Sequence, residues 1–190
     1  MGSSAVQGEL WGRAARDWAQ FNEPSCEPFY EAVFDSIGLS DGQSLLDAGC
    51  GSGHALQLAA KRGAKVSGLD ASSELLQVIR ERVADGAIEQ GDLEEIPFPD
   101  NSFDAVTAFN SVQYAADPVA ALRECRRVAK PGAPVAILTL GRCGGLRNSG
   151  HPRGHRRPAP STTTGSGRTF RPQPAGALPC VSGLYEAGGS

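Results

Sequence analysis

The segment Leu45-Leu46-Asp47-Ala48-Gly49-Cys50-Gly51-Ser52-Gly53 decides the fold of this chain, and Gly68-Leu69-Asp70 follows it about twenty residues later. An apolar run ends at an acidic residue, three glycines follow at alternate positions, and a second apolar run ends at another aspartate. Glycine lets the backbone turn tightly and approach a ligand, and the next helix offers free N–H groups. An acidic residue that ends a second strand can accept both hydroxyls of a ribose. The segment therefore predicts a strand–helix–strand unit with a nucleotide site.

The spacing of the glycines argues against a nicotinamide dinucleotide. The pattern G-x-G-x-x-G/A needs a small residue where this chain has His54, and the third glycine comes one residue early. A short-chain dehydrogenase remains an alternative because it shares the same unit. Its Tyr-x-x-x-Lys pair is absent from the sequence: the residues four positions after the three tyrosines are Phe34, Pro118 and Gly189.

Read with its neighbours, D-A-G-C-G-S-G resembles motif I of the class I S-adenosylmethionine-dependent methyltransferases. Residues 91–104, G-D-L-E-E-I-P-F-P-D-N-S-F-D, are similar to the G-D-x-x-x-L-P-F-x-D-x-S-F-D signature of the small-molecule, ubiquinone- and menaquinone-biosynthesis-like branch. Residues 121–132 resemble the helix and turn before its fifth strand. The resemblance covers residues 9–141. It implies S-adenosylmethionine as cofactor and methyl transfer to a small-molecule acceptor.

The pattern of apolar runs predicts the α/β class, with a doubly wound, mostly parallel sheet that resembles the Rossmann-like methyltransferase core. Strands are expected over residues 44–48, 66–69, 87–89, 105–109 and 134–140. Helices are expected over residues 55–62, 72–83 and 118–129, and two more at the N-terminus over 9–21 and 27–37, which Pro24 separates. The ligand crevice should lie beyond the carboxyl ends of the strands.

The resemblance assigns the cofactor site residue by residue. It implies a cofactor loop of Asp47, Gly49, Gly51 and Gly53, with Asp70 on the ribose, Ala71 and Ser72 beside the adenine, Asp92 and Leu93 on the adenine, and Asn110 at the cofactor and substrate edge. For two of these residues an ordinary structural role is the alternative. Asp70 would then be a solvated carboxylate after a strand, and Asp92 a helix N-cap.

The catalytic base stays unassigned, because many relatives carry histidine where this chain has Gln113 and Tyr114. His54, Gln113 and Tyr114 are candidates, His54 because its unperturbed pKa lies near neutrality. Capping or packing is the alternative role for His54. Trp11, Tyr30 and Tyr114 are candidates for substrate contact, since the N-terminal helices of the superfamily often form a lid; ordinary packing of amphipathic helices is the alternative.

Composition divides the chain near residue 141. Residues 1–140 hold 11 Lys/Arg and 20 Asp/Glu, whereas residues 141–190 hold seven arginines and one acidic residue, Glu186. The second part also has 11 Gly and 6 Pro, so we expect a low-complexity tail over 142–190 without fixed structure, after a core domain over 1–141. The arginines of this tail are scattered among prolines and glycines, so we expect no nucleic-acid partner.

Several function classes are excluded by what the sequence lacks. There is no 18-residue apolar run and no signal-peptide pattern, which predicts a cytoplasmic protein without a membrane anchor. Five cysteines without a C-x-x-C pair indicate reduced thiols, and the His151-x-x-x-His155 spacing is interpreted as an accident of tail composition, so no metal is expected. The oligomeric state is left open.

The family-like pattern ends near Leu140 and Gly141. Full members of the superfamily resemble a seven-stranded sheet, so the chain is expected to lack the last two strands, and the fifth strand would be an edge. The change to Arg, Gly, Pro, Ala, Ser and Thr is what an out-of-frame reading of a GC-rich coding sequence would produce. A truncated or frameshifted cofactor-binding remnant without turnover is therefore the alternative function, and a natural extension is the alternative origin of the tail.

Overall fold

The computed structural model describes residues 3–141 and 180–181. Its main helices are α1 (Ser4–Gly12), α3 (Glu27–Ser36), α4 (His54–Lys61), α5 (Ser73–Arg82) and α6 (Pro118–Val128). The shorter ones are α2 (Ala15–Asp17), the π-helix η1 (Trp18–Asn22), and the 3-10 helices η2 (Glu23–Cys26) and η3 (Val112–Tyr114). The strands are β1 (Ser44–Ala48), β2 (Lys65–Asp70), β3 (Ala87–Gln90), β4 (Ala105–Phe109) and β5 (Val135–Leu138).

The five strands form one sheet in the order β3-β2-β1-β4-β5, and every neighbouring pair is parallel. Asp47, near the carboxyl end of β1, stands opposite Gly68 on β2 and Thr107 on β4. From β1 the chain runs outward to β2 and β3, then crosses back to the other side of β1 and runs outward through β4 and β5. The predicted α/β doubly wound sheet is confirmed, and the described sheet is fully parallel. A ligand crevice is expected where the order reverses, between β1 and β4.

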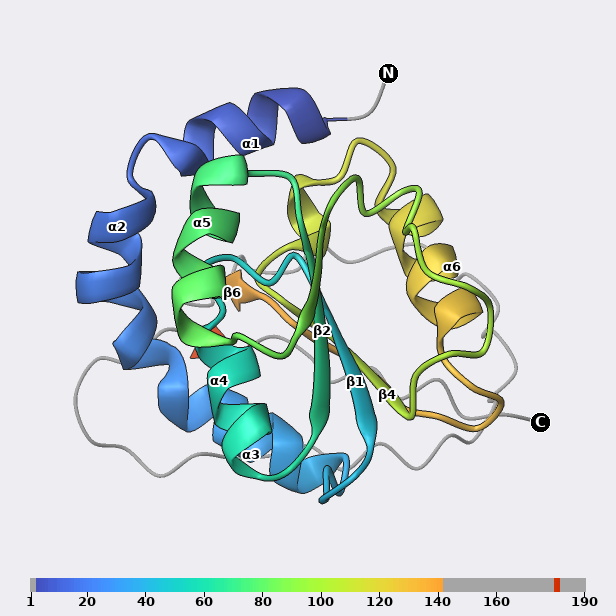
Figure 1. Ribbon diagram of the computed structural model, residues 1–190. Coiled ribbons are helices and arrows are strands. Elements are labelled where there is room, and N and C mark those ends of the chain that lie inside the picture. Colours follow the sequence, from blue (N-terminus) through green and yellow to red (C-terminus); the bar gives the residue numbers. More distant parts are fainter. Residues whose placement is uncertain (1–2, 142–179, 182–190) are drawn as a thin grey trace, which may run out of the picture. The chain divides into compact units, whose positions relative to one another are not determined.

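Helices cover both faces of the sheet (Figure 1). Leu45 packs with residues of α3, α4 and α5 on one face, whereas its neighbour Leu46 packs with residues of α6 on the other. Both leucines are fully buried. Because successive side chains of a strand point to opposite faces, a strand buried on both sides needs a continuous apolar run. The short apolar runs of the sequence satisfy that requirement.

The strands and the three helices between them lie within a few residues of the predicted ranges. Local signals explain this agreement. Ser72 caps α5 by accepting the backbone N–H of Leu75, and Asp117 caps α6 by accepting those of Val119 and Ala120. The largest difference among the strands is β5, which spans four residues where seven were expected.

The first N-terminal helix, expected over residues 9–21, is confirmed in part: most of these residues are helical, but the helix starts earlier and is divided. The structure starts α1 at Ser4, ends it at Gly12, and then continues through α2, η1 and η2 directly into α3. Pro24 does not separate two helices, because it occupies the first turn of η2, where a proline needs no N–H partner. The second expected helix is confirmed as α3.

Two further short strands, β6 (Leu140–Gly141) and β7 (Cys180–Val181), pair with each other, and the sequence did not predict the second. The predictions for the tail, including its arginines and the His151 and His155 pair, fall mostly outside the described residues. Within the described ranges the main sheet has five strands, so the last two strands of a seven-stranded arrangement are not among them. No helix in these ranges is long and apolar enough to cross a membrane.

Candidate functional site

The turn after β1 is tight because its first residue is glycine. Gly49 has a φ of +82°, and a Cβ atom there would lie 2.2 Å from the Cβ of Ser111. The Ser111 hydroxyl donates a 2.6 Å hydrogen bond to the carbonyl of Ala48, which holds the end of β4 against the loop. The N–H groups of Gly49 and Cys50 both donate to the carbonyl of Leu69, at 2.7 and 2.9 Å. The loop is thus fixed between β2 and β4.

The carboxylate of Asp70 braces this loop. Its Oδ2 accepts the backbone N–H of Gly51 at 2.9 Å, and its Oδ1 accepts that of Ser72 at 2.9 Å. Burial raises the pKa of Asp70, while the bonds from Ser72 and Gly51 act against that shift. The sequence left a solvated carboxylate after a strand as the alternative role of Asp70. The structure does not agree with that alternative, because the carboxylate is bonded at both oxygens and joins the glycine loop to the start of α5.

A second carboxylate, Asp47, is buried where β1 and β4 diverge. The Thr107 hydroxyl of β4 donates a 2.9 Å hydrogen bond to its Oδ1, and the residue is 2% exposed. Burial raises the pKa of Asp47 to about 7; the Thr107 bond opposes the rise, and the nearby charges of Asp70 and Glu23 add to it. The group is therefore poised to lose its proton when a cation comes close.

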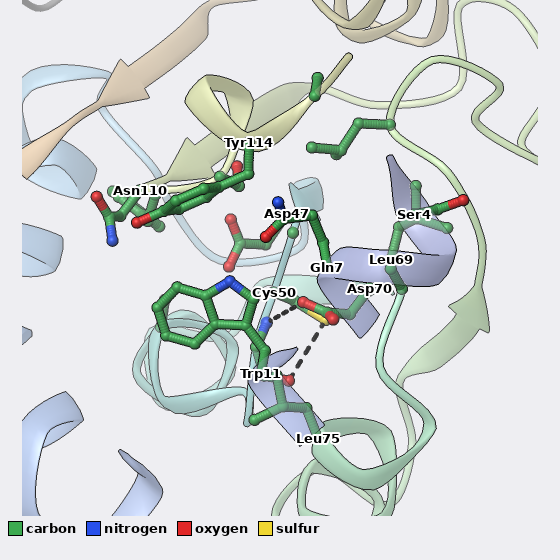
Figure 2. Close-up of a pocket in the computed structure, with 18 of the residues that line it drawn as sticks. Ser4, Gln7, Trp11, Asp47, Cys50, Leu69, Asp70, Leu75, Asn110 and Tyr114 are labelled. Carbon is green, nitrogen blue, oxygen red and sulfur yellow. Dashed lines mark hydrogen bonds between the residues drawn. The ribbon is translucent and has the colours of Figure 1, made fainter. Parts of the chain in front are cut away.

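These groups open into one cavity at the carboxyl ends of the strands (Figure 2). Eleven of the residues that the sequence predicted for the site line it: Trp11, Tyr30, Asp47, Gly49, Gly51, Asp70, Ala71, Asp92, Leu93, Asn110 and Tyr114. They come from the N-terminal segment and from the ends of all the first four strands. The structure thus brings together residues up to about a hundred positions apart in the sequence.

Two predicted cofactor residues, Gly53 and Ser72, lie outside the cavity lining. Gly53 precedes α4 with a φ of +83°, and a Cβ there would lie 2.2 Å from Cγ1 of Ile79. Ser72 is 1% exposed, and its hydroxyl is engaged in capping α5. Gly53 and Ser72 therefore shape the turns before α4 and α5, and other residues of these turns line the cavity.

Two of the three candidates for the base also lie outside the lining. The Nε2 atom of His54 is 3.1 Å from Oε2 of Glu27, which agrees with the capping or packing alternative. The side-chain amide of Gln113 donates to Oδ1 of Asn110. Only Tyr114 of the three lines the cavity.

Asp92 does not begin a helix. Its Oδ1 accepts the backbone N–H of Glu94 at 3.0 Å, and an antiparallel bridge joins Asp92 to Glu95 in a short turn. The helix-cap alternative is therefore wrong for Asp92. Asn110, directly after β4, has a φ of +52°, a left-handed conformation that asparagine adopts more readily than most other residues with a side chain.

Residues 3–26, here called the N-terminal cover, close one side of the cavity. Gly8 lets α1 approach the turn after β2, since a Cβ there would lie 2.6 Å from the carbonyl oxygen of Ala71. The indole of Trp11 meets the ring of Tyr114 edge to face at 5.5 Å, and the Ser3 hydroxyl donates to the Tyr114 carbonyl at 2.6 Å. The cover thus contacts the turn after β2 and the loop after β4.

Glu23 ties the cover to the glycine loop. It is 3% exposed, and its Oε2 accepts the Ser52 hydroxyl and, at 2.6 Å, Nη1 of Arg82. Arg82 also donates from Nη2 to the carbonyl of Ala19 at 3.1 Å. Sequence reasoning missed Glu23, because no local spacing links it to a serine and an arginine that lie 29 and 59 positions away. The Gly8-x-x-x-Gly12 spacing was the available signal for a closely docked helix.

The cavity carries negative charge. The described lining contains no Lys, Arg or His. It contains four acidic residues: Glu23, Asp47, Asp70 and Asp92. A cavity lined by charge of one sign attracts ligands of the other sign. The arrangement therefore fits a cationic group beside a ribose-binding turn. It agrees with a sulfonium nucleoside better than with an anionic dinucleotide.

The comparisons with known proteins agree with this geometry. The sequence profile of a family described as "Methyltransferase domain" matches residues 46–137. Over 141 residues the chain is 36% identical to the ubiquinone biosynthesis O-methyltransferase of Alkalilimnicola ehrlichii, with 68% of this chain and 56% of that protein covered. It is 39% identical to the malonyl-[acyl-carrier protein] O-methyltransferase of Serratia marcescens, over 52% of this chain and 39% of that one.

Among solved structures, a SAM-dependent methyltransferase from Aquifex aeolicus is 29% identical with a TM-score of 0.55, over 65% of this chain and 69% of that one. The chain spans about half the length of the curated relatives it matches. The predicted resemblance, the fold and the cofactor agree with these comparisons. Residues 46–137 are a methyltransferase domain, the core around them has the fold of the class I S-adenosylmethionine-dependent methyltransferases, and its cofactor is S-adenosylmethionine.

Proposed function

We propose that the chain transfers a methyl group from S-adenosylmethionine to a neutral small-molecule acceptor. The observation that carries the proposal is the cavity itself, where Asp47, Asp70 and the glycine loop meet beneath the N-terminal cover. The cofactor supplies a methyl group on a positively charged sulfur. The acidic lining suits that charge, and the absence of a side chain at Gly51, where a Cβ would have only Oε1 of Glu23 within 4 Å, leaves space for the ligand.

The order of the strands supports one orientation of the cofactor. Asp92 and Leu93 follow β3, Asp70 ends β2, and Asp47 with the glycine loop ends β1. Because parallel strands end at one edge, these groups succeed one another along it. We assign the adenine to Asp92 and Leu93, the ribose hydroxyls to Asp70, and the methionine to the loop beside Asp47. We place Ala71, which follows Asp70, between the adenine and the ribose. Asn110, directly after β4, lies on the other side of the glycine loop.

Methyl transfer from a sulfonium is an in-line displacement of a group that is already activated, so positioning and exclusion of water carry most of the work. The cover supplies the exclusion, since Trp11 and Tyr114 close over the cavity. The base remains unassigned: Tyr114 lines the cavity, whereas His54 and Gln113 are engaged elsewhere. Trp11 and Tyr114 are the proposed contacts for the acceptor.

The acceptor that suits the lining is neutral and partly apolar. No described lining residue is a cation that could pair with a carboxylate or phosphate, while Trp11, Phe109 and Tyr114 offer aromatic surface. Of the two acceptors that the relatives' names indicate, the ubiquinone precursor fits this lining better than the malonyl group, which carries a carboxylate. We therefore place the acceptor among neutral aromatic or quinone-like molecules.

The test begins with isothermal titration of S-adenosylmethionine, S-adenosylhomocysteine and NAD. We expect micromolar binding of the first two and none of NAD. Transfer of a labelled methyl group is then followed over a panel of neutral phenols and of aliphatic carboxylates, with the phenols expected to react. Cofactor binding without any transfer would favour the remnant without turnover, and binding of NAD alone would restore the dehydrogenase alternative.

A further inference from the structure

Glu23 has a carboxylate oxygen that faces the cofactor cavity. The residue is 3% exposed and lines the cavity together with Gly51 and Asp47. Its Oε1 lies next to the glycine loop, because a Cβ placed on Gly51 would be 3.9 Å from it. Glu23 is therefore a buried charge at the wall of the site, on a segment outside the sheet.

The two oxygens of this carboxylate are engaged to different degrees. Oε2 accepts the Ser52 hydroxyl and the Arg82 guanidinium, whereas the bond to Oε1 is a long one, 3.4 Å from the backbone N–H of His54. An ionised carboxylate offers about four acceptor positions, so Oε1 can take a further donor. Arg82 offsets the cost of burying the charge and leaves the cavity side of the carboxylate for another partner.

The proposed orientation places the amino-acid end of the cofactor at this wall. The ribose at Asp70 and the adenine at Asp92 leave the β1 loop for the methionine, and Glu23 is bonded to Ser52 of that loop. The methionine end carries an α-ammonium group with three N–H donors. Two other acidic groups of the described lining are near this loop. Asp70 accepts the N–H groups of Gly51 and Ser72 and is assigned to the ribose, and the hydroxyl of Thr107 already donates to Oδ1 of Asp47.

We propose that Glu23 binds the α-ammonium group of the methionine end of S-adenosylmethionine through Oε1, while Oε2 holds the cover on the glycine loop. This role rests on the proposed function. It adds a residue of the N-terminal cover to the cofactor site, and it makes the amino-acid end of the cofactor the part that the cover recognises. A purely structural Glu23 would not distinguish ligands that keep this end from ligands that lack it.

Two thioether ligands separate these roles. S-adenosylhomocysteine carries the ammonium group, whereas 5′-methylthioadenosine lacks the whole amino-acid end, and neither has a charged sulfur. In Glu23→Gln we expect S-adenosylhomocysteine to bind about 10- to 100-fold more weakly, the loss of one charge-assisted hydrogen bond. The affinity for 5′-methylthioadenosine should stay within about twofold. Both are measured by isothermal titration.

Glu27→Gln is the matched control, because Glu27 lies on the adjacent helix α3, pairs with His54, and does not line the cavity. It should leave both affinities unchanged. Decarboxylated S-adenosylhomocysteine, which keeps only the ammonium, should respond to Glu23→Gln as strongly as the complete ligand does. Equal losses for S-adenosylhomocysteine and 5′-methylthioadenosine in Glu23→Gln would overturn the role of Glu23 and leave the proposed function standing.

Failure of the parent protein to bind either thioether would overturn the proposed function and the role of Glu23 together. Circular dichroism establishes that each variant is folded. If Glu23→Gln does not fold, Glu23→Asp replaces it, since the shorter carboxylate keeps the charge and withdraws it from the cavity. A larger loss for S-adenosylhomocysteine than for 5′-methylthioadenosine then supports the proposal, and equal losses contradict it.

Discussion

The glycine loop and the N-terminal cover face the same cavity, but they are held in different ways. The loop is fixed by backbone N–H groups that bond to Leu69 and Asp70 and by the hydroxyl of Ser111. The cover rests on a few contacts between distant residues, among them Gly8 on Ala71 and the Glu23 pair with Arg82. A site made in this way has a rigid side and a side that depends on single side chains. The four substitutions below probe that difference.

The largest effect should follow from Asp70→Ala on the loop side. The variant loses the carboxylate assigned to the ribose and also the two bonds that brace Gly51 and Ser72. We expect S-adenosylmethionine affinity to fall by about 2–4 kcal/mol, from 1.5–3 kcal/mol per charged hydrogen bond less what water recovers. Isothermal titration measures this, and urea unfolding should show a loss of stability as well.

Asp85→Ala is the control, since Asp85 is exposed beyond the end of α5. It should change neither affinity nor stability. Equal cofactor affinity in folded Asp70→Ala and in the parent protein would remove the main support for the ribose assignment.

On the cover side, Arg82→Met should lower the free energy of unfolding by about 3 kcal/mol. The substitution leaves Glu23 buried without its cation, and breaking a buried pair by removing one partner typically costs 3–5 kcal/mol. We expect the lower end of this 3–5 kcal/mol range because the Arg82 side chain is partly exposed. Urea unfolding gives the value, and the double variant Glu23→Gln/Arg82→Met should regain part of the loss.

Arg16→Met serves as the matched control, because Arg16 pairs with Glu81 on the exposed surface. Such pairs contribute about 0–1 kcal/mol. Similar losses for Arg82→Met and Arg16→Met would mean that the buried pair does not hold the cover.

A pH dependence distinguishes the buried carboxylate of the loop side. The pKa of Asp47 is about 7 in the folded chain and 3.8 for the unperturbed group. Between these values the folded state binds more protons than the unfolded state, so stability falls as pH rises from about 4 to about 7 and is level above. Asp47→Asn removes this titration and keeps an acceptor for the Thr107 hydroxyl.

We therefore expect Asp47→Asn to be more stable than the parent protein by up to about 4 kcal/mol at pH 8, with the difference shrinking towards pH 4. Urea unfolding without cofactor at pH 4, 6 and 8 measures it. A constant difference across this range would show that Asp47 does not titrate there, and Asp70 would then be the next group to test, because its pKa is also raised.

The smallest effect is expected for Gly8→Ala. A Cβ at this position would lie 2.6 Å from the carbonyl oxygen of Ala71, which belongs to the backbone and cannot move aside easily. Alanine favours the helix itself by up to about 1 kcal/mol, so α1 should stay helical while its docking weakens. Hydrogen exchange should rise for residues 4–12 and for the turn at Ala71, with global stability changed by about 1 kcal/mol at most.

Val6→Ala on the exposed face of α1 is the control for this variant. It should leave hydrogen exchange at Ala71 unchanged. Unchanged exchange in Gly8→Ala as well would show that close approach at Gly8 does not hold the cover.

The sequence predicted the sheet and the loop well because both depend on local signals. Apolar runs that end at Asp47 and Asp70, and glycines that a Cβ could not replace, mark strand ends without knowledge of the rest of the chain. The start of the helix after Asp70 was predicted to within one residue for the same reason. The place of Ser72 beside the adenine stays a prediction; its hydroxyl accepts the backbone N–H of Leu75 and so caps α5.

The cover could not be predicted in the same way. Its first helix begins earlier than its hydrophobic pattern indicated, because α1 is held by docking at Gly8 and by the Trp11–Tyr114 contact rather than by a strongly amphipathic face. Glu23 and Arg82 become partners only when the chain has folded. Contacts of this kind leave no spacing in the sequence.

The aromatic contact between Trp11 and Trp18 has a practical consequence. These are the only two tryptophans of the 190 residues, and both lie in the cover, with ring centroids 5.2 Å apart. Intrinsic fluorescence excited at the indole band therefore reports on this segment alone, while far-ultraviolet circular dichroism reports on the whole chain. Fluorescence of the two tryptophans can therefore record detachment of the N-terminal cover separately from unfolding of the sheet.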